Sequence, residues 1–312
     1  TGYTLRVAFP WAEVPIALYF GKHDNEMMQG VRLSASLFNI PIETPDATTA
    51  KKYFPQFDIG NDFETIVERD AGFLTPEKAI KLFVQQAQNK GATIHTHEKV
   101  IEWKKEGSYI TVTTDKSMYE CNKLIICGGA WAGKLLPSLR QTITVTRQFI
   151  AWMKVKNETD FALNNFPCWL LADEEMPGCF YGFPILPKEK FGEPYGLKIA
   201  YHYPGTISDP DKVNRETLQE DIDTIMYAAN KFFPGKIESI AASKTCLYSY
   251  TPDENFIIDK LPGYEDNIIT ACGFSGHGFK FASVIGEILA ELATEGKSKL
   301  PVDFLTAERF LK

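Results

Sequence analysis

The stretch Ile268-Ile-Thr-Ala-Cys-Gly-Phe-Ser-Gly-His-Gly-Phe-Lys280 combines an apolar run, a glycine-rich loop and a terminal lysine. Its apolar first part predicts a buried strand, and Gly273, Gly276 and Gly278 permit a tight turn with close backbone approach. The apolar residues between 281 and 292 predict a helix directly after the loop. Unpaired N–H groups at a helix N-terminus bind anions, and the lysine adds a full positive charge there. The pattern therefore indicates a ligand-binding loop, although a purely structural turn has the same pattern.

A second stretch, Cys246-Leu-Tyr-Ser-Tyr-Thr-Pro-Asp-Glu-Asn-Phe-Ile-Ile-Asp259, precedes this loop. Together with Cys272-Gly-Phe-Ser-Gly-His-Gly-Phe-Lys-Phe281, it resembles the monomeric sarcosine oxidase and N-methyltryptophan oxidase family of FAD-dependent amine oxidoreductases. The resemblance extends from about Asp70 to the C-terminus. It implies that FAD is the cofactor, that Cys246 carries it covalently, and that the glycine loop lies at the flavin.

The resemblance implies an α+β or α/β fold with two domains. We expect residues 62–141 and 243–312 to form a discontinuous, Rossmann-like FAD-binding domain that is incomplete at its N-terminus. Residues 1–61 and 142–242 should form a substrate domain with a mixed or antiparallel sheet. FAD-binding domains of this class open with a strand, a G-x-G-x-x-G turn and a helix that bind the ADP half of the cofactor. The sequence contains no such motif, so either the polypeptide is truncated or it does not hold FAD in the usual way.

The composition favours small-molecule chemistry. A length of 312 residues suggests about two domains, and 44% hydrophobic with 23% charged residues is typical of a soluble globular protein. A net charge of -7 argues against a nucleic-acid or anionic-membrane partner. No apolar run is long enough for a membrane span, and no signal peptide is evident. The six cysteines include no C-x-x-C pair, so free thiols in a reducing cytoplasm are the simpler interpretation.

The first half of the chain alternates helices with strands. One helix is marked at both ends, because Thr75 is a good N-cap, Pro76 suits the first helical position, and an apolar stripe stops before Gly91. His95 and His97 resemble a metal pair on a strand, but no third ligand lies nearby, so we expect surface residues and no metal. We predict strands at residues 3–9, 62–68, 91–101, 109–113, 118–120 and 123–127, and further helices at 26–38 and 44–55.

Part of this region is assigned to the cofactor by the resemblance. It implies that the backbone around Val100 contacts the adenine. The last predicted strand of the region runs into Gly128-Gly-Ala-Trp131, and the resemblance places this turn beside the diphosphate. The cofactor-binding residues expected here are therefore Val100, Gly128, Gly129 and Trp131.

From Thr142 the pattern changes to long strands rich in aromatic residues. A sheet with one exposed and one buried face suits a substrate domain that covers the flavin ring. We predict strands at residues 142–156, 179–184 and 196–203 and a helix at 215–233, after which residues 243–250 return the chain to the first domain.

Cys246 carries the most specific prediction. A thiolate that adds at the flavin 8-methyl carbon leaves a thioether, which holds the cofactor and raises its reduction potential. The surrounding Thr-Cys-Leu-Tyr sequence matches the family. The alternative is a buried free cysteine, which is the commonest fate of this residue type.

Lys198 alternates with apolar neighbours in Tyr195-Gly-Leu-Lys-Ile-Ala-Tyr-His202, so we expect its side chain to point inward from a strand. A desolvated lysine is costly unless it meets an anion, and both the reduced flavin and superoxide are anions. The resemblance implies that Lys198 activates oxygen. The alternative is a lysine at the edge of a sheet.

Lys280 resembles the family residue that binds the substrate carboxylate. Its partner in the family is an arginine from an N-terminal segment that has no counterpart here. A single cation binds a carboxylate more weakly than the bidentate arginine geometry allows. The alternative is a surface lysine at the start of a helix.

The remaining site residues are assigned by the resemblance. His202, Tyr181 and Tyr248 match positions that shape the pocket above the flavin and polarise the amine. Gly276 and His277 are expected to offer backbone groups to the flavin or the substrate. The loop residues expected to contact the cofactor are Gly273, Phe274, Gly276, His277, Gly278, Phe279 and Lys280.

The implied reaction converts a secondary amino acid, such as sarcosine, another N-methyl amino acid or pipecolate, to an imine, while oxygen is reduced to hydrogen peroxide. Proximity and a preorganised cation would supply most of the rate. We expect the sulfur of Cys246 and the ammonium groups of Lys198 and Lys280 to converge on one flavin ring. A monomer is the favoured oligomeric state. The alternatives are a flavin dehydrogenase with another electron acceptor, and a non-catalytic relative that only binds a ligand or a partner.

Overall fold

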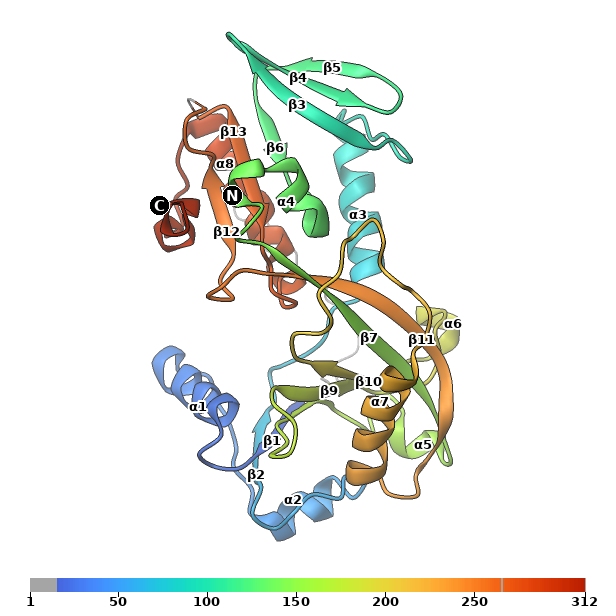
Figure 1. Cartoon of the computed structure of the whole chain (residues 1–312). Coiled ribbons are helices and arrows are strands. Elements are labelled where there is room, and N and C mark those ends of the chain that lie inside the picture. The colour runs from blue at the N-terminus through green and yellow to red at the C-terminus, as the bar shows by residue number, and fades with distance from the viewer. Residues whose placement is uncertain (1–15, 265, 312) are drawn as a thin grey trace. The chain divides into compact units, whose positions relative to one another are not determined.

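The computed structural model describes residues 16–264 and 266–311, so the strand predicted at residues 3–9 lies outside the described residues. The chain folds into two compact units (Figure 1). Of the described residues, the first unit contains 16–73, 148–204 and 214–246, and the second contains 74–147, 205–213, 247–264 and 266–311. The chain crosses between the two units at five points, and two of these lie inside strands, between Arg147 and Gln148 in the strand Thr144–Val155 and between Cys246 and Leu247 in the strand Ile237–Tyr250. Which residues bind FAD and which bind substrate stays a prediction.

A seven-stranded mixed sheet organises the first unit. Most neighbouring strands for which a register is known run antiparallel, but β1 and β8 are parallel. In sheet order, the strands are β11 (Ile237–Tyr250), β7 (Thr144–Val155), β10 (Leu197–His202), β9 (Cys179–Phe183), β8 (Cys168–Leu171), β1 (Ala17–Gly21) and β2 (Glu64–Glu68).

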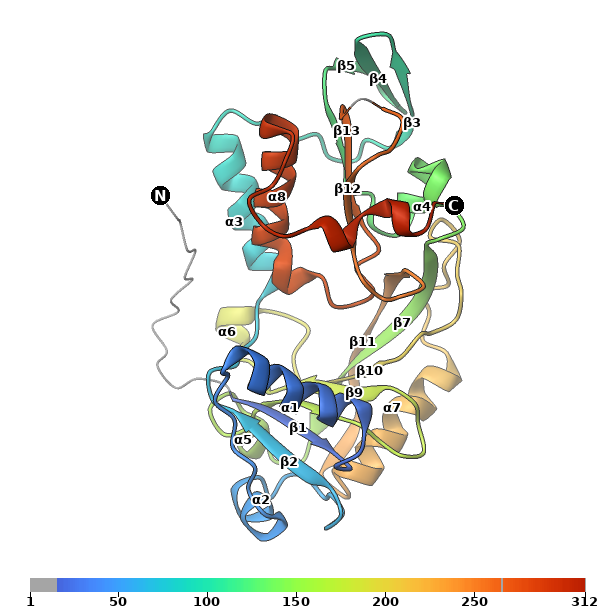
Figure 2. The ribbon, with the colours of Figure 1, turned by 90° about the vertical axis from the view of Figure 1, so that its left-hand side faces the viewer.

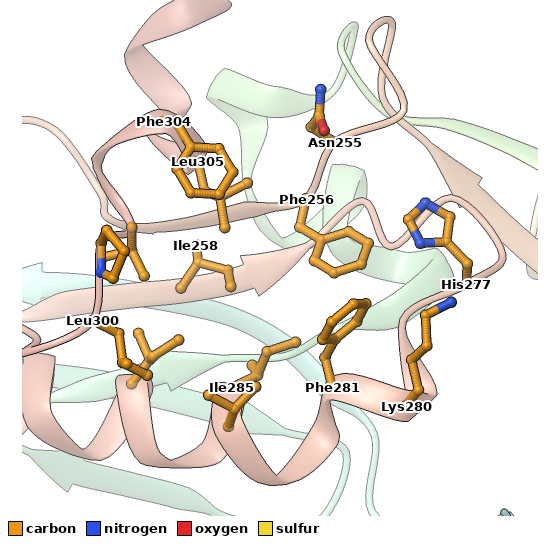
Figure 3. A pocket seen from close by; sticks show the side chains of 14 residues that line it. Asn255, Phe256, Ile258, His277, Lys280, Phe281, Ile285, Leu300, Phe304 and Leu305 are labelled. Carbon is orange, nitrogen blue, oxygen red and sulfur yellow. The ribbon is translucent and has the colours of Figure 1, made fainter. Parts of the chain in front are cut away.

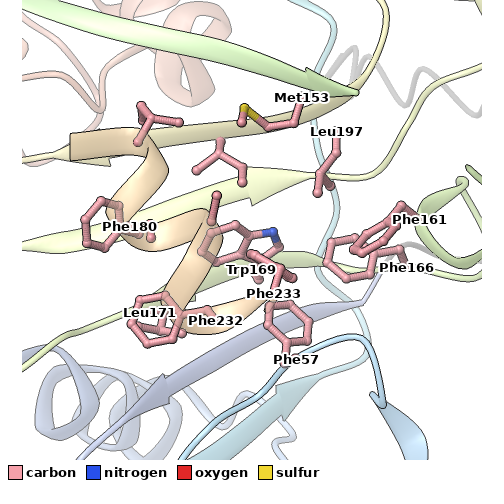
Figure 4. Close-up of a cluster of buried hydrophobic side chains, with 14 of the residues drawn as sticks. Phe57, Met153, Phe161, Phe166, Trp169, Leu171, Phe180, Leu197, Phe232 and Phe233 are labelled. Atoms are coloured by element: carbon pink, nitrogen blue, oxygen red, sulfur yellow. The ribbon is translucent and has the colours of Figure 1, made fainter. Parts of the chain in front are cut away.

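One face of this sheet is buried under helix α7 (Gln219–Phe232) and a cluster of aromatic residues (Figure 4). Trp169 and Phe233 are almost fully buried, and their ring centroids lie 5.5 Å apart. The Phe57 ring lies 5.0 Å from that of Phe233 and 5.0 Å from that of Phe166. Because α7 covers one face only, side chains on the other face of β7, β9 and β10 remain available for other contacts.

The second unit contains two three-stranded sheets. In one sheet β13 (Ile268–Cys272), which is buried along its whole length, pairs in parallel with β6 (Leu124–Ile126) and antiparallel with β12 (Ile257–Lys260). Helix α8 (Ala282–Glu295) runs alongside β13 and buries Ile285, Ile288, Leu289 and Leu292 (Figure 2). The other sheet is an antiparallel meander of β3 (Val100–Glu106), β4 (Tyr109–Thr114) and β5 (Met118–Cys121). The mixed α/β fold class is thus confirmed.

The remaining helices lie outside the sheets. These remaining helices are α1 (Glu26–Phe38), α2 (Ala47–Tyr53), α3 (Pro76–Asn89), α4 (Ala132–Leu135), α5 (Glu158–Phe161) and α6 (Lys188–Phe191). None of the helices within the described residues is long and apolar enough to cross a bilayer.

Helix α3 forms where its terminal signals predicted it, but no residue of the helix is buried. Ile80 is 50% exposed and Phe83 is 38% exposed, so its apolar stripe stays in contact with solvent. Thr75 occupies the N-cap position without a side-chain hydrogen bond to the helix. The apolar stripe therefore predicted the helix correctly but not the burial of its face.

Two sequence predictions of secondary structure were wrong in extent. The strand predicted at residues 91–101 begins only at Val100, because Gly91 and His97 adopt positive φ values of 91° and 55° that interrupt an extended chain. The helix predicted at 215–233 begins only at Gln219. Residues before it instead bond to β11, since Thr217 Oγ1 and Ser243 Oγ lie 2.8 Å apart.

Replacing Phe233 with alanine should remove a fully buried ring from the aromatic cluster. We expect the free energy of unfolding to fall by about 3–5 kcal/mol in urea denaturation, because a cavity replaces the ring. Phe38→Ala is the matched control, since Phe38 is 73% exposed, and should change the stability by less than about 0.5 kcal/mol. Equal losses in the two variants would contradict the assignment of the core.

Candidate functional site

Lys198 lies on the face of the seven-stranded sheet that α7 does not cover. In the sheet register, Lys198 is opposite Trp152 of β7 and Phe183 of β9. Its Nζ lies 5.7 Å from the ring centroid of Trp152, 6.0 Å from that of Tyr181 and 4.9 Å from that of Phe183. These rings hold a partly buried ammonium by cation–π contact. The expected inward position of Lys198 is consistent with this arrangement.

Cys246 lies on β11, which is the neighbour of β7 in the sheet. Burial raises the pKa of its thiol, while the charges of Lys198 and Arg215 lower it in part. Lys244 precedes Cys246 by two residues, and its Nζ lies 5.9 Å from the ring centroid of Trp152. Alternate residues of a strand share a face, so Cys246 and Lys198 lie on the same face of the sheet.

The same face carries two more of the predicted residues. His202 follows Lys198 by four residues in β10, and Tyr181 is opposite Ala200 in β9. The rings of Tyr181 and His202 lie 6.4 Å apart in an edge-to-face arrangement. The first unit therefore brings Lys198, His202, Tyr181 and Cys246 together on one surface.

The glycine loop of the second unit follows β13 and has left-handed backbone at several positions. The φ angles of Gly273, Ser275 and Gly276 are 67°, 47° and 81°. The N–H of the buried Ser275 donates to the carbonyl of Ser249 at 2.9 Å. A Cβ on Gly276 would lie 2.3 Å from the ring of Tyr248, so only glycine permits this close packing. Tyr248 thus lies directly against the loop.

His277 and Lys280 follow at the end of the loop. The ring of His277 packs against Phe256 at 4.9 Å, and its Nε2 lies 3.3 Å from the carbonyl oxygen of Glu254. Burial lowers the pKa of His277, so the neutral imidazole is favoured. Desolvation also lowers the pKa of Lys280. No acidic side chain of the described residues forms an ion pair with Lys280.

An apolar pocket of about 380 Å³ opens beside this end of the loop (Figure 3). His277 and Lys280 line one end of it, and Leu300 and Phe304 lie toward the other end. All of its lining residues belong to the second unit.

The turn after β6 contains the other residues assigned to the cofactor. Gly129 has a φ of 52°, and a Cβ built on it would meet nothing within 4 Å, so the backbone here is open to a ligand. The indole N–H of Trp131 donates to Asp211 at 2.8 Å. Val100 lies at the start of β3 and is 38% exposed. Contacts of this turn with a diphosphate and an adenine stay predictions.

Each unit by itself carries groups that fit part of FAD. In the first unit, the thiol beside the Lys198 cation suits a ring system that becomes anionic on reduction. In the second unit, the glycine loop with its lysine suits an anionic or electron-rich group. The open turn at Gly129 suits a phosphate approaching the backbone. For the ADP half, the sequence supplies no G-x-G-x-x-G turn. A metal centre has no candidate in the described part of the chain, where no cluster of His, Cys, Asp or Glu could hold an ion.

Sequence reasoning missed Trp152, Arg215 and Lys244. Trp152 follows the alternating pattern of β7, but only the strand register shows that it is opposite Lys198. Arg215 is held beside β11 because its guanidinium donates to the carbonyl of Thr245 at 3.3 Å. The expected convergence of Lys280 with Cys246 and Lys198 stays a prediction, since Lys280 belongs to the second unit.

Known proteins resemble the chain in both sequence and fold. Monomeric sarcosine oxidase of Streptomyces avermitilis is 32% identical over 93% of this chain and 74% of its own length. N-methyl-L-tryptophan oxidase of Shigella dysenteriae is 32% identical over 93% of this chain and 75% of its own. The solved structure of NikD, described as an unusual amino acid oxidase, superposes with a TM-score of 0.78 at 20% identity, over 94% of this chain and 77% of NikD.

L-proline dehydrogenase from P. horikoshii shares the fold with a TM-score of 0.76 at 22% identity, over 95% of this chain and 76% of its own. The model of the FAD dependent oxidoreductase family matches residues 7–292. The chain therefore belongs to the FAD-dependent oxidoreductase family that includes monomeric sarcosine oxidase and N-methyl-L-tryptophan oxidase.

Proposed function

We propose that this protein is an FAD-dependent oxidase of secondary amino acids, of the sarcosine, N-methyl amino acid or pipecolate type, with FAD attached through Cys246. The observation that carries the proposal is the placement of a half-buried thiol and the Lys198 ammonium on one face of the sheet, since Lys198 and the strand neighbour Lys244 both contact the Trp152 ring. The names of the relatives support an N-methylated amino acid as the substrate.

FAD, when bound, accepts two electrons and a proton equivalent from the amine and returns them to oxygen. For an N-methyl amino acid, the balanced reaction consumes oxygen and water and yields the primary amino acid, formaldehyde and hydrogen peroxide. The side chains assigned to the site include no strong general base, so the amine must enter as the free base. The protein's part is to bind, orient and stabilise charge.

Lys198 is suited to oxygen reduction because its charge is already in place before any anion forms. Its Nζ lies within 6.0 Å of the ring centroids of Trp152, Tyr181 and Phe183, so the ammonium is partly shielded from water. A fixed cation in a site with little water stabilises a developing negative charge without reorganisation. Lys198 is therefore assigned to the step in which oxygen becomes anionic.

Lys280 is assigned to the substrate carboxylate. None of the described acidic side chains pairs with it, and its desolvation favours an external anion. Tyr181 and His202 are assigned to the wall of the substrate site on the first unit. Tyr248, which packs on the glycine loop of the second unit, is assigned a pocket-shaping role on the strength of the resemblance alone.

Cys246→Ser should leave flavin that is released by acid precipitation, whereas the unmodified protein should keep its yellow colour in the acid pellet. Serine lacks the nucleophilic thiolate that forms the thioether. Cys127→Ser, which changes an exposed cysteine of the second unit, is the control and should behave like the unmodified protein. Colour retained in the pellet of the Cys246 variant would contradict the attachment site, and a colourless unmodified protein would contradict the proposed function.

Lys198→Met should slow reoxidation by oxygen by about 10²–10³-fold in stopped-flow experiments, because the preorganised cation is lost. Reduction of the flavin by substrate should change much less. Lys244→Met is the control, since Lys244 contacts the same tryptophan ring from β11. If reoxidation by oxygen is slow in the unmodified protein and an artificial acceptor restores turnover, the protein is a dehydrogenase instead.

Lys280→Met should raise KM for an N-methyl amino acid by about 10–100-fold, because a hydrogen bond between charged groups is lost. N-methylbenzylamine, which has no carboxylate, should be affected much less. Lys297→Met, at an exposed position after α8, is the control for loss of a surface charge. Parallel losses for both amines would show that Lys280 does not bind the carboxylate.

A further inference from the structure

The apolar pocket of the second unit is built from three segments. Ile258 of β12 and Phe256, which directly precedes β12, line the pocket on one side. Ile285 and Ile288 line it from the buried stripe of α8. Leu300 and Phe304 close the pocket from the C-terminal segment (Figure 3). A volume of about 380 Å³ lies within the range of roughly 300–1,000 Å³ typical of small-molecule sites.

The titratable groups of the pocket lie where it meets the glycine loop, and the amide of Asn255 is a further polar group in its lining. Lys280 supplies a positive charge and His277 an imidazole that burial keeps neutral, and Figure 3 shows the two side chains next to each other. The opposite end has no charged side chain among its lining residues. A ligand that fits both ends has an anionic head and an apolar body.

We propose that this pocket binds the apolar body of a small carboxylate whose carboxyl group pairs with Lys280. If the proposed function is correct, that body is the side chain of the amino acid substrate. The substrate class would then be N-alkylated amino acids with a large aromatic or branched aliphatic side chain. Sarcosine, which has no side chain, would leave the pocket empty and gain nothing from it.

Binding can be measured without turnover by isothermal titration of the purified protein with 3-phenylpropionate and with propionate. We expect 3-phenylpropionate to bind at least about 10-fold more tightly, because burying a phenyl group removes a large apolar surface from water. Lys280→Met should remove binding of both compounds. Equal affinities for the two compounds would overturn the proposal.

Two variants of α8 separate filling of the pocket from a general effect on the helix. Val284→Phe replaces a small isopropyl group of the pocket lining with a phenyl ring and should lower the affinity for 3-phenylpropionate by about 10-fold or more. Ala290→Phe adds the same ring at an exposed position of α8 outside the pocket, and should leave the affinity unchanged. Unchanged affinity in Val284→Phe, in a protein that melts at the same temperature as Ala290→Phe, would overturn the proposal.

Turnover measurements then distinguish a failure of the pocket proposal from a failure of the proposed function. With both correct, kcat/KM for N-methyl-L-phenylalanine exceeds that for sarcosine by about 10-fold or more, and Val284→Phe reduces this ratio. If 3-phenylpropionate binds as expected and no secondary amine is oxidised, the pocket is supported and the proposed function fails. If sarcosine is oxidised at least as well and Val284→Phe changes neither substrate, the pocket proposal fails and the proposed function stands.

Discussion

The position of the Lys198 ammonium depends on the antiparallel register of three strands. Pairing of β10 with β7 and β9 puts Lys198 opposite Trp152 and Phe183, and the rings of these residues form the walls around its Nζ. A shift of one residue would turn Lys198 toward α7 and the aromatic core, where an unpaired charge is costly. The packing of α7 on the opposite face therefore determines which side of the sheet carries the candidate chemistry.

The same sheet also determines the burial of the Cys246 thiol and the charges that lie near it. Burial disfavours the thiolate, while Lys198 and Arg215 favour it, so the cysteine is neither an exposed reactive group nor an inert core residue. Arg215 is held by reciprocal hydrogen bonds with Thr245, the residue just before the cysteine. These contacts explain why the chain from 214 to 218 follows β11 and does not join helix α7.

Local patterns in the sequence predicted most of the helices and strands, but they predicted fewer of the tertiary contacts and less of the burial of these elements. Alternation around Lys198 predicted its strand, and the glycines after β13 predicted the loop, because both depend on neighbouring residues alone. Trp152 was missed because its contact with Lys198 depends on a strand register that no local pattern contains. The strand expected at 91–101 failed at His97, whose left-handed backbone gives no signal in composition. The stripe of α3 predicted a helix, but burial depends on what packs against it, and that face is exposed.

The proposed function depends on covalent attachment of the flavin to the sulfur of Cys246, on the face of the sheet that α7 does not cover. Its most direct test is tryptic digestion of the purified protein, followed by chromatography at a flavin wavelength and mass spectrometry. Cleavage after Lys244 and Lys260 yields a peptide that spans residues 245–260 and contains Cys246 as its sole cysteine. The account predicts that flavin absorbance and the adduct mass coincide on this peptide. An unmodified 245–260 peptide, with flavin free in solution or attached to another cysteine, would contradict it.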